Sequence, residues 1–229
     1  MFTFSEVKSE QVKEIILKLN PRKSVSGPIT VKLLQMVADI VSEPITSCLN
    51  AMIKSSSFPH ILKLAEVTPV YKKKDKFLKE NYRPISVLPA LSKVFERVIL
   101  KQLTGYFDGI LHPNLCGFRS KHNTQHALLQ MIGKWNKCSE NSGRVGAILM
   151  DLSKAFDCID HELLIAKLAA YGLDHSSLKL LKCYLSNRFQ KTKVGSFFSF
   201  WIQIPQGSIL GPLLFKFFYK RSDISHNQN

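Results

Sequence analysis

The chain has 229 residues, 45% of them hydrophobic, which excludes a chain too polar to build a core and fits one large domain or two small ones. Its formal charge is +15, from 32 Lys and Arg against 17 Asp and Glu. This basic excess favours a polyanionic partner, because each phosphate that a protein neutralises releases condensed counterions. General solubility is the alternative explanation of the charge.

Cysteine use and hydropathy bear on the compartment. Five cysteines lie far apart with no CxxC pair, which indicates reduced thiols in an intracellular protein, nuclear or cytoplasmic. Cys116, His122, His126 and Cys138 can be drawn as a zinc site, but their spacing matches no common finger.

The N-terminus shows no secretory signal. Residues 197–218 are long enough to span a bilayer, but prolines and glycines interrupt them, so we expect a buried strand, turn and helix and no membrane partner.

Helical patterns dominate the first third of the chain. Apolar residues at helical spacing mark a helix over 12–19, which ends at an Asn-Pro pair. The same pattern predicts a second helix over 31–41 that stops before Pro44, and a third over 45–53 that fades into a run of serines.

Extended and helical segments alternate from residue 65 onward, and this mixture favours the α+β class. A buried strand over 145–150 is expected to end at Asp151. The other expected elements, in chain order, are extended segments at 65–71 and 82–88 joined by a charged loop at 72–76, a helix that starts at Pro89, a helix capped by Asn123 or Thr124 that reaches Cys138, a helix over 162–171 capped by Asp160 and stopped at Gly172, a helix from Asp174 to Leu185, and a β-hairpin over 191–204.

Two motifs carry chemistry. A buried strand that delivers the carboxylate of Asp151 to its mouth is one way to hold a divalent cation. About fifty residues later, residues 205–212 read PQGSILGP, in which a Gln-Gly turn lets the backbone approach a nucleotide closely. Together these motifs point to nucleotidyl transfer.

These motifs belong to a longer series that appears in one order along the chain. In that order the chain resembles the reverse transcriptase of non-LTR (LINE-type) retrotransposons, from the start of the fingers into the palm. The matching segments are KS at 23–24 with GP at 27–28, FP at 58–59, VTPVYKK at 67–73, NYRPIS at 81–86, KVFE at 93–96, GFR at 117–119 with His122 and Thr124, DLSKAFD at 151–157 with DH at 160–161, and PQGSILGP at 205–212.

The resemblance implies phosphoryl transfer assisted by Mg²⁺, with Asp151 as the first metal-binding aspartate and the Leu152 carbonyl as an added ligand. A strand-end turn or helix cap is the alternative role of Asp151. Phe156 matches an aromatic steric gate that selects deoxynucleotides, and a core phenylalanine is its alternative. The resemblance implies that Gln206 and Gly207 form the dNTP-binding turn, with a plain tight turn as the alternative.

Basic residues match the family's fingers. Arg83 and Lys72 are expected to clamp the incoming triphosphate, because the planar fork of arginine binds phosphate oxygens bidentately. Lys73 and Lys74 are expected to contact nucleic acid, although a solvated hairpin tip or a nuclear-import patch explains the lysine run as well. The resemblance further implies RNA template, DNA primer or hybrid duplex, and dNTP as partners. The expected template-facing residues are Arg119 and His122, and a surface histidine is the alternative for the latter.

The match departs from the family in two places. Residues 27–30 lack the acidic residue that usually follows Gly-Pro. After residue 215 the chain drifts off the pattern. Asp223 is the only acid after the Gln-Gly turn, in the region where the family carries an Asp-Asp hairpin. We therefore expect a truncated chain that is inactive or nearly so, because one carboxylate does not offset the repulsion of two metal ions. A non-catalytic nucleic-acid-binding remnant and an unfolded product are the alternatives.

The fold expected from all of this is α+β, the fingers and incomplete palm of a right-hand polymerase, with a short antiparallel sheet backed by helices. We expect three parts. They are a fingers-like region with an N-terminal helical extension over 1–144, a partial palm over 145–215, and an off-pattern, disordered tail over 216–229.

Overall fold

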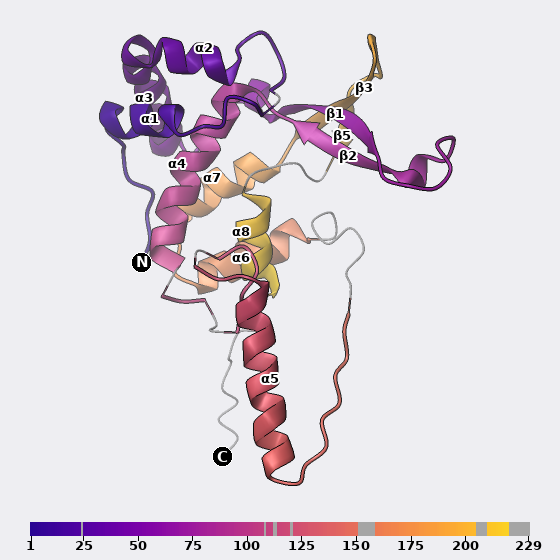
Figure 1. Cartoon of the computed structure of the whole chain (residues 1–229). Helices are drawn as coiled ribbons and strands as arrows, with labels where there is room; N and C mark the ends of the chain where they lie inside the picture. The colour runs from indigo at the N-terminus through magenta and orange to yellow at the C-terminus, as the bar shows by residue number, and fades with distance from the viewer. Residues whose placement is uncertain are drawn as a thin grey trace.

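The computed structural model describes residues 1–23, 25–107, 109–111, 114–119, 121–150, 159–204 and 210–219. Figure 1 shows most of the helices gathered into one body, a sheet that extends from one side of this body, and one long helix that reaches away from it. The helices are α1 (Ser9–Leu17), α2 (Val31–Met36), α3 (Ala38–Ser55), α4 (Ala90–Phe107), α5 (Thr124–Glu140), α6 (His161–Ala170), α7 (His175–Leu185) and α8 (Gly211–Tyr219), with short 3₁₀ turns η1 (His60–Lys63) and η2 (Lys79–Asn81).

The core lies between helices that come from both halves of the chain. Each of α1, α3, α4, α6, α7 and α8 turns an apolar stripe inward, and removing such a side chain from water contributes roughly 1.5–3 kcal/mol. Fully buried members of this core include Val12, Ile16, Leu49, Val94, Leu103, Phe107, Leu168, Leu181 and Phe217. None of the helices in the described ranges is long and apolar enough to cross a membrane.

The predicted helix stop at Pro44 is wrong. Helix α3 runs through this proline, and the chain instead breaks about two turns earlier, at Val37 between α2 and α3. A proline removes one backbone hydrogen bond. Here a single continuous helix keeps Ala38, Ile45 and Leu49 on the same buried stripe, and that burial outweighs the lost bond.

Several predicted helix ends are confirmed by their caps. The side chains of Asn123, Asp160 and Asp174 each accept a hydrogen bond from the backbone N–H three residues on, at the starts of α5, α6 and α7. Gly172 follows α6 with a φ of 93°, and a Cβ at this position would lie 2.7 Å from the Tyr106 hydroxyl oxygen. Glycine is therefore required there both by conformation and by space.

The sheet confirms the α+β class and corrects the pairing. Its strands are β1 (Leu64–Tyr71), β2 (Tyr82–Val87), β3 (Arg188–Val194), β4 (Phe197–Phe198) and β5 (Ile202–Ile204). The order is β2-β1-β3-β4, with β5 also on β3. All pairs are antiparallel except β1 with β3, which is parallel, so the sheet is mixed. The reason is that η1 leads into β1 and α7 leads into β3 from the same helical body, so both strands leave it in the same direction.

The buried strand predicted over 145–150 is not found. These residues form no strand, and Ile148, Leu149 and Met150 are 88%, 89% and 86% exposed. A strand needs a neighbour for its N–H and C=O groups, and within the described ranges no strand lies beside this run. The apolar side chains predicted burial, but the sequence did not indicate which element would cover them.

The tail predicted to begin at residue 216 is also corrected. Residues 216–219 form the last turn of α8, in which Phe217 is fully buried with its ring centroid 3.9 Å from that of Phe107. The helical spacing of Leu213, Leu214 and Phe217 places one apolar face on the core, and this packing carries the helix past the expected boundary. Residues 220–229 lie outside the described part.

A buried polar junction joins the sheet to the helical body. Glu96 on α4 has no exposed surface and accepts a hydrogen bond from the Tyr184 hydroxyl on α7. Arg188, at the start of β3, is 2% exposed; its Nη1 donates to the Tyr184 carbonyl over 3.1 Å. The buried amine of Lys63, just before β1, donates to the carbonyls of Cys183 and Ser186 at the end of α7. We refer to Lys63, Glu96, Tyr184 and Arg188 as the polar junction.

The first residues of the chain are fastened to the turn between α6 and α7. The Phe2 N–H donates to the Gly172 carbonyl over 2.7 Å, and the Asp174 N–H donates to the Phe2 carbonyl over 2.9 Å. The Phe4 N–H then donates to the Ser177 hydroxyl over 3.0 Å in a buried position. This clasp ties the N-terminus to a segment that comes about three quarters of the way along the chain.

Removing the α7 cap should make the protein less stable in a pH-dependent way. Burial raises the pKa of Asp174, but hydrogen bonds from Ser176, Ser177 and Thr3 outweigh it and lower the pKa from 3.8 to about 2. A depressed folded pKa stabilises above pH 3.8, and that contribution is lost as the pH falls towards about 2. Asp174→Ala should cost about 1 kcal/mol at neutral pH and lack this acid loss, whereas Asp174→Asn keeps the cap. Urea unfolding at neutral and acid pH measures both effects, and equal pH profiles for wild type and Asp174→Ala would contradict the assignment.

Loss of the Tyr184 hydroxyl should destabilise the whole fold. Tyr184→Phe removes a donor to a fully buried carboxyl group, which costs about 1–3 kcal/mol in the free energy of unfolding. Tyr82→Phe is the matched control, because that hydroxyl donates to the Lys76 carbonyl on the outer hairpin and should change stability by only about 0.5 kcal/mol. Thermal and urea melts compare the two variants, and similar losses in both would argue against a special role of the junction.

Candidate nucleotide and nucleic-acid interface

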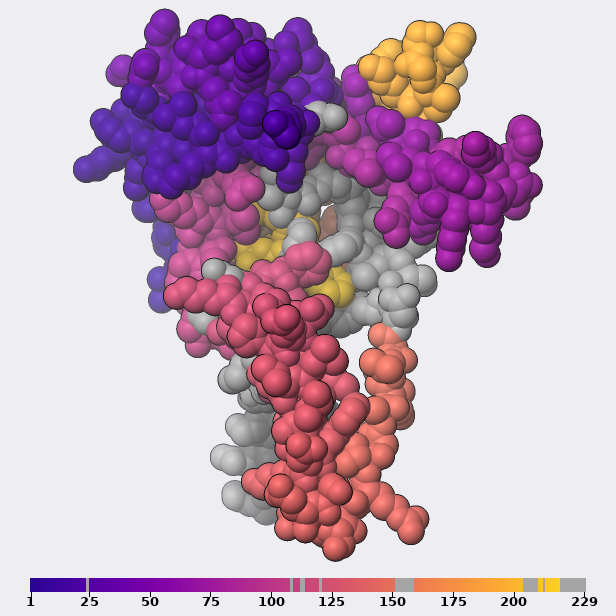
Figure 2. Space-filling model, viewed as in Figure 1, coloured from indigo at the N-terminus to yellow at the C-terminus, as the bar shows by residue number. Residues whose placement is uncertain are grey.

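The β1–β2 hairpin projects from the body and has an ordered tip. The Lys72 N–H donates to the Asn81 carbonyl over 2.8 Å, and the Asn81 side chain donates to the Asp75 carbonyl over 2.7 Å. The rings of Tyr71 and Tyr82 meet edge to face with centroids 5.7 Å apart. Figure 2 shows the hairpin as a lobe that stands clear of the helices. The tip therefore presents its side chains on a defined backbone.

Four of the residues predicted to contact the nucleotide or the nucleic acid lie together on this hairpin. Lys72, Lys73 and Lys74 occupy the exposed tip, and Lys74 takes a left-handed φ of 74°. Arg83 on β2 pairs with Val70 across the strands and is exposed. Three ammonium groups and one guanidinium thus share one projecting element, an arrangement that attracts and holds phosphate oxygens.

Arg119 and His122 lie in a different place, in the turn before α5. The His122 N–H donates to the Arg119 carbonyl over 3.3 Å, and both side chains are half-buried. The Lys216 amine donates to the Phe118 carbonyl over 2.8 Å, which fastens this turn to α8. The structure therefore divides the predicted basic residues between two elements.

The predicted catalytic and nucleotide-turn residues are not among those the structure describes. Asp151, Leu152, Phe156, Gln206 and Gly207 all lie outside the described ranges. Their described neighbours are the irregular run that ends at residue 150, strand β5 directly before the Gln-Gly motif, and helix α8 after it.

No described group of three or more His, Cys, Asp or Glu side chains is placed to hold a metal ion. Cys116, His122, His126 and Cys138, from which a zinc site can be drawn in the sequence, are among these described residues and make no such group. The Cys138 thiol contacts the Arg144 carbonyl instead, and the described cysteines are free thiols.

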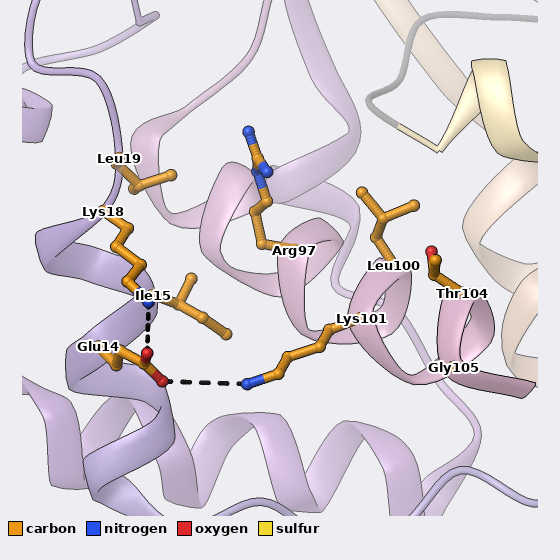
Figure 3. Close-up of a pocket in the computed structure, with 9 residues that line it drawn as sticks. All are labelled: Glu14, Ile15, Lys18, Leu19, Arg97, Leu100, Lys101, Thr104 and Gly105. Carbon is orange, nitrogen blue, oxygen red and sulfur yellow. Dashed lines mark hydrogen bonds and ion pairs between the residues drawn. The ribbon is translucent and has the colours of Figure 1, made fainter. Parts of the chain in front are cut away.

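Helices α1 and α4 enclose a groove of about 370 Å³ that the sequence did not predict (Figure 3). Ile15, Leu19 and Leu100 line its apolar part, and Lys18, Arg97, Lys101, Glu14, Thr104 and Gly105 complete it. Glu14 pairs with Lys18 over 2.5 Å and with Lys101 over 3.9 Å. The hydrogen bond from Lys18, with the charges of Lys18 and Lys101, lowers the pKa of Glu14. The groove is thus basic at its rim and contains none of the predicted site residues.

A second unpredicted feature is a set of lysines beside aromatic rings on β3 and its partners. Lys191 contacts the rings of Phe198 and Trp201, and Lys193 contacts Phe198. The alternation over 191–204 predicted a hairpin, but only the strand register shows which of its side chains share a face.

The α+β fold carries a projecting hairpin with exposed basic side chains, on a chain whose net charge is +15. Residues 71–228 match the family described as reverse transcriptase (RNA-dependent DNA polymerase). This match covers more than half of the 229 residues, and the chain belongs to that family.

Three relatives are transposon proteins from flies. The chain is 30% identical over 222 residues to a probable RNA-directed DNA polymerase from transposon BS of Drosophila melanogaster, covering 91% of this chain and 23% of that protein. It is 30% identical over 216 residues to the probable enzyme from transposon X-element of the same species, covering 90% and 23%. It is also 30% identical over 217 residues to the RNA-directed DNA polymerase from mobile element jockey of Drosophila funebris, covering 91% and 24%. The chain thus spans about a quarter of the length of these relatives.

The exposed position of Arg83 predicts a direct effect on nucleotide affinity. Arg83→Ala should weaken binding of a deoxynucleoside triphosphate about tenfold, because hydrogen bonds between charged groups contribute roughly 1.5–3 kcal/mol. Calorimetry with a hybrid whose primer is chain-terminated measures this affinity. Arg97→Ala removes another exposed arginine, on α4, and should leave the affinity unchanged. Equal losses in the two variants would mean that only total charge matters.

Proposed function

We propose that this chain supplies the fingers and part of the palm of a reverse transcriptase that adds deoxynucleotides to a primer 3′-end on an RNA template. Membership of the reverse transcriptase family is the observation that carries this proposal. The named relatives are RNA-directed DNA polymerases, which fits the same activity. The proposed fingers-like part runs over 1–144 and contains the projecting basic hairpin of β1 and β2. The proposed palm begins at 145 and contains β5 and α8.

The proposed substrate contacts follow the motifs and the exposed basic side chains. The hairpin binds the triphosphate through Arg83 and Lys72, since both are exposed on the same projecting element. The remaining proposed contacts are Phe156, Gln206 and Gly207 with the nucleotide, and Lys73, Lys74, Arg119 and His122 with the nucleic acid.

Mg²⁺ is the proposed cofactor, with the Asp151 carboxylate and the Leu152 carbonyl as ligands. When bound, the metal polarises phosphate oxygens and offsets charge that develops as the phosphoryl group is transferred. Two such ions repel each other and need several anionic ligands. The motifs of this chain supply one such carboxylate, so we propose that these 229 residues alone bind hybrid and nucleotide without extending a primer.

A non-catalytic nucleic-acid-binding module is the second candidate. The charge of +15 and the exposed lysine tip favour it, because neither depends on catalytic carboxylates. Both candidates require the hairpin surface. The polymerase part should bind a nucleotide at Arg83 only when a primer end is paired with the template, whereas the non-catalytic module should show no such dependence.

Primer extension and hybrid binding test the proposal together. The purified chain is given an RNA template, a DNA primer, the four dNTPs and Mg²⁺. The expected result is a salt-sensitive mobility shift of the hybrid with no extension. Extension that is lost in Asp151→Asn but kept in Asp39→Asn, which changes an exposed aspartate on α3, would overturn the proposed inactivity and establish the polymerase. Absence of both binding and extension would overturn the proposed function.

A further inference from the structure

Strands β3, β4 and β5 place a lysine–aromatic cluster on one face of the sheet. We define this cluster as Lys191, Lys193, Phe198 and Trp201. Lys193 pairs directly with Phe198 across the strands. Gln190 pairs with Ile202, so Lys191 lies opposite Trp201 on the same face. The Lys191 amine is 4.2 Å from the Phe198 ring centroid and 5.1 Å from that of Trp201.

The two lysines of the cluster have different surroundings. Lys191 is held by an ion pair of 3.3 Å with Glu66 on β1, and its side chain is only 23% exposed. Its amine thus contacts both rings while it is paired with Glu66. Lys193 is exposed and lies 5.3 Å from the Phe198 ring centroid, so its charge remains available to a ligand.

The rings present accessible aromatic surface beside that charge. Phe198 is 49% exposed and Trp201 is 45% exposed, even though each contacts a lysine. An exposed aromatic patch on a protein usually marks a binding surface, because leaving it in water is unfavourable. Stacked planar bases cover such rings, and a neighbouring lysine neutralises the phosphate that follows each base.

The strand register places this cluster on the same face of the sheet as Arg83. Lys191 pairs with Glu66, and Glu66 pairs with Val87 of β2. Residues 83, 85 and 87 of β2 alternate onto that face, so Arg83 lies about 13 Å along the strand from the row of the cluster. The proposed triphosphate contact and the aromatic rings thus share one face of the sheet, and Figure 2 shows β3 and its turn projecting beside the β1–β2 lobe.

We propose that the lysine–aromatic cluster is a stacking site for single-stranded nucleic acid, with bases on Trp201 and Phe198 and a phosphate on Lys193. This inference rests on the proposed function and assigns to it a strand-binding site on β3–β5. The net charge of +15 and the alternation of cations with rings favour a nucleic acid over an uncharged protein partner. A lipid surface fits less well, because Lys191 and Glu66 occupy the centre of the patch.

Tryptophan fluorescence tests the site directly. The chain has two tryptophans, so Trp135→Phe leaves Trp201 as the reporter. Titration of this variant with an oligothymidylate or oligouridylate of about 12 nucleotides should quench the emission saturably, since site sizes of this order are usual for stacking platforms. Lys193→Ala should lower the slope of log affinity against log salt by about 0.7, the single-strand value for one phosphate contact.

Adjacent phenylalanines provide a matched pair of variants. In the same reporter background, Phe198→Ala should weaken strand binding about tenfold, which corresponds to 1.4 kcal/mol. Phe197→Ala removes an 80% exposed ring that pairs with Val194 on the opposite face, and it should leave binding unchanged. Circular dichroism melts confirm that both variants fold.

Three results would overturn the inference. They are equal losses in Phe197→Ala and Phe198→Ala, no quenching of Trp201 by either oligonucleotide, and quenching by anionic phospholipid vesicles but not by oligonucleotides. If hybrid binding persists, and nucleotide affinity still depends on Arg83, while the cluster variants behave like wild type, only this inference fails. If the chain binds no nucleic acid in any form, the proposed function fails with it.

Discussion

The buried carboxyl group of Glu96 constrains the arrangement of everything around it. A polar group with no exposed surface must be hydrogen-bonded, and the Tyr184 hydroxyl on α7 serves this need. Because Arg188 follows α7 and donates back to the Tyr184 carbonyl, the position of α4 also determines where β3 begins. Lys63 binds the same end of α7 and determines where β1 begins. One polar junction thus aligns two strands that are more than a hundred residues apart in sequence.

The polar junction and the core hold the inner half of β1 in place, and this inner half supports the projecting β1–β2 hairpin. Close to the body, Ala65 and Val67 of β1 are buried, whereas the outer half of the strand is exposed. The parallel pairing of β1 with β3 extends over the inner residues only, and the hairpin beyond it rests on β2 and on its own tip contacts. The basic side chains therefore project into solvent from a base that the core holds in place.

Local signals in the sequence were enough for many of the helix boundaries. Asn123, Asp160 and Asp174 cap their helices because a short polar side chain beside an apolar periodic run leaves few other conformations. Pairing between distant strands has no local signal, so the parallel β1–β3 contact was not predicted. The strand predicted over 145–150 was wrong for a related reason, since an apolar pattern does not indicate which strand would pair with it. The family motifs predicted the basic residues of the hairpin. The lysine–aromatic face could be recognised only from the pairing register of β3, β4 and β5.

The clasp at the N-terminus has a consequence for how the chain is made. Phe2 and Phe4 bind the turn around Gly172 and Ser177, and α3 and α4 complete their core against α7. A ribosome releases α1 to α4 long before it has synthesised these partners. The apolar side chains of these early helices stay exposed until α7 is made, so the core is completed late in translation. Slow synthesis between α4 and α7 would prolong the interval in which the nascent chain is vulnerable to aggregation.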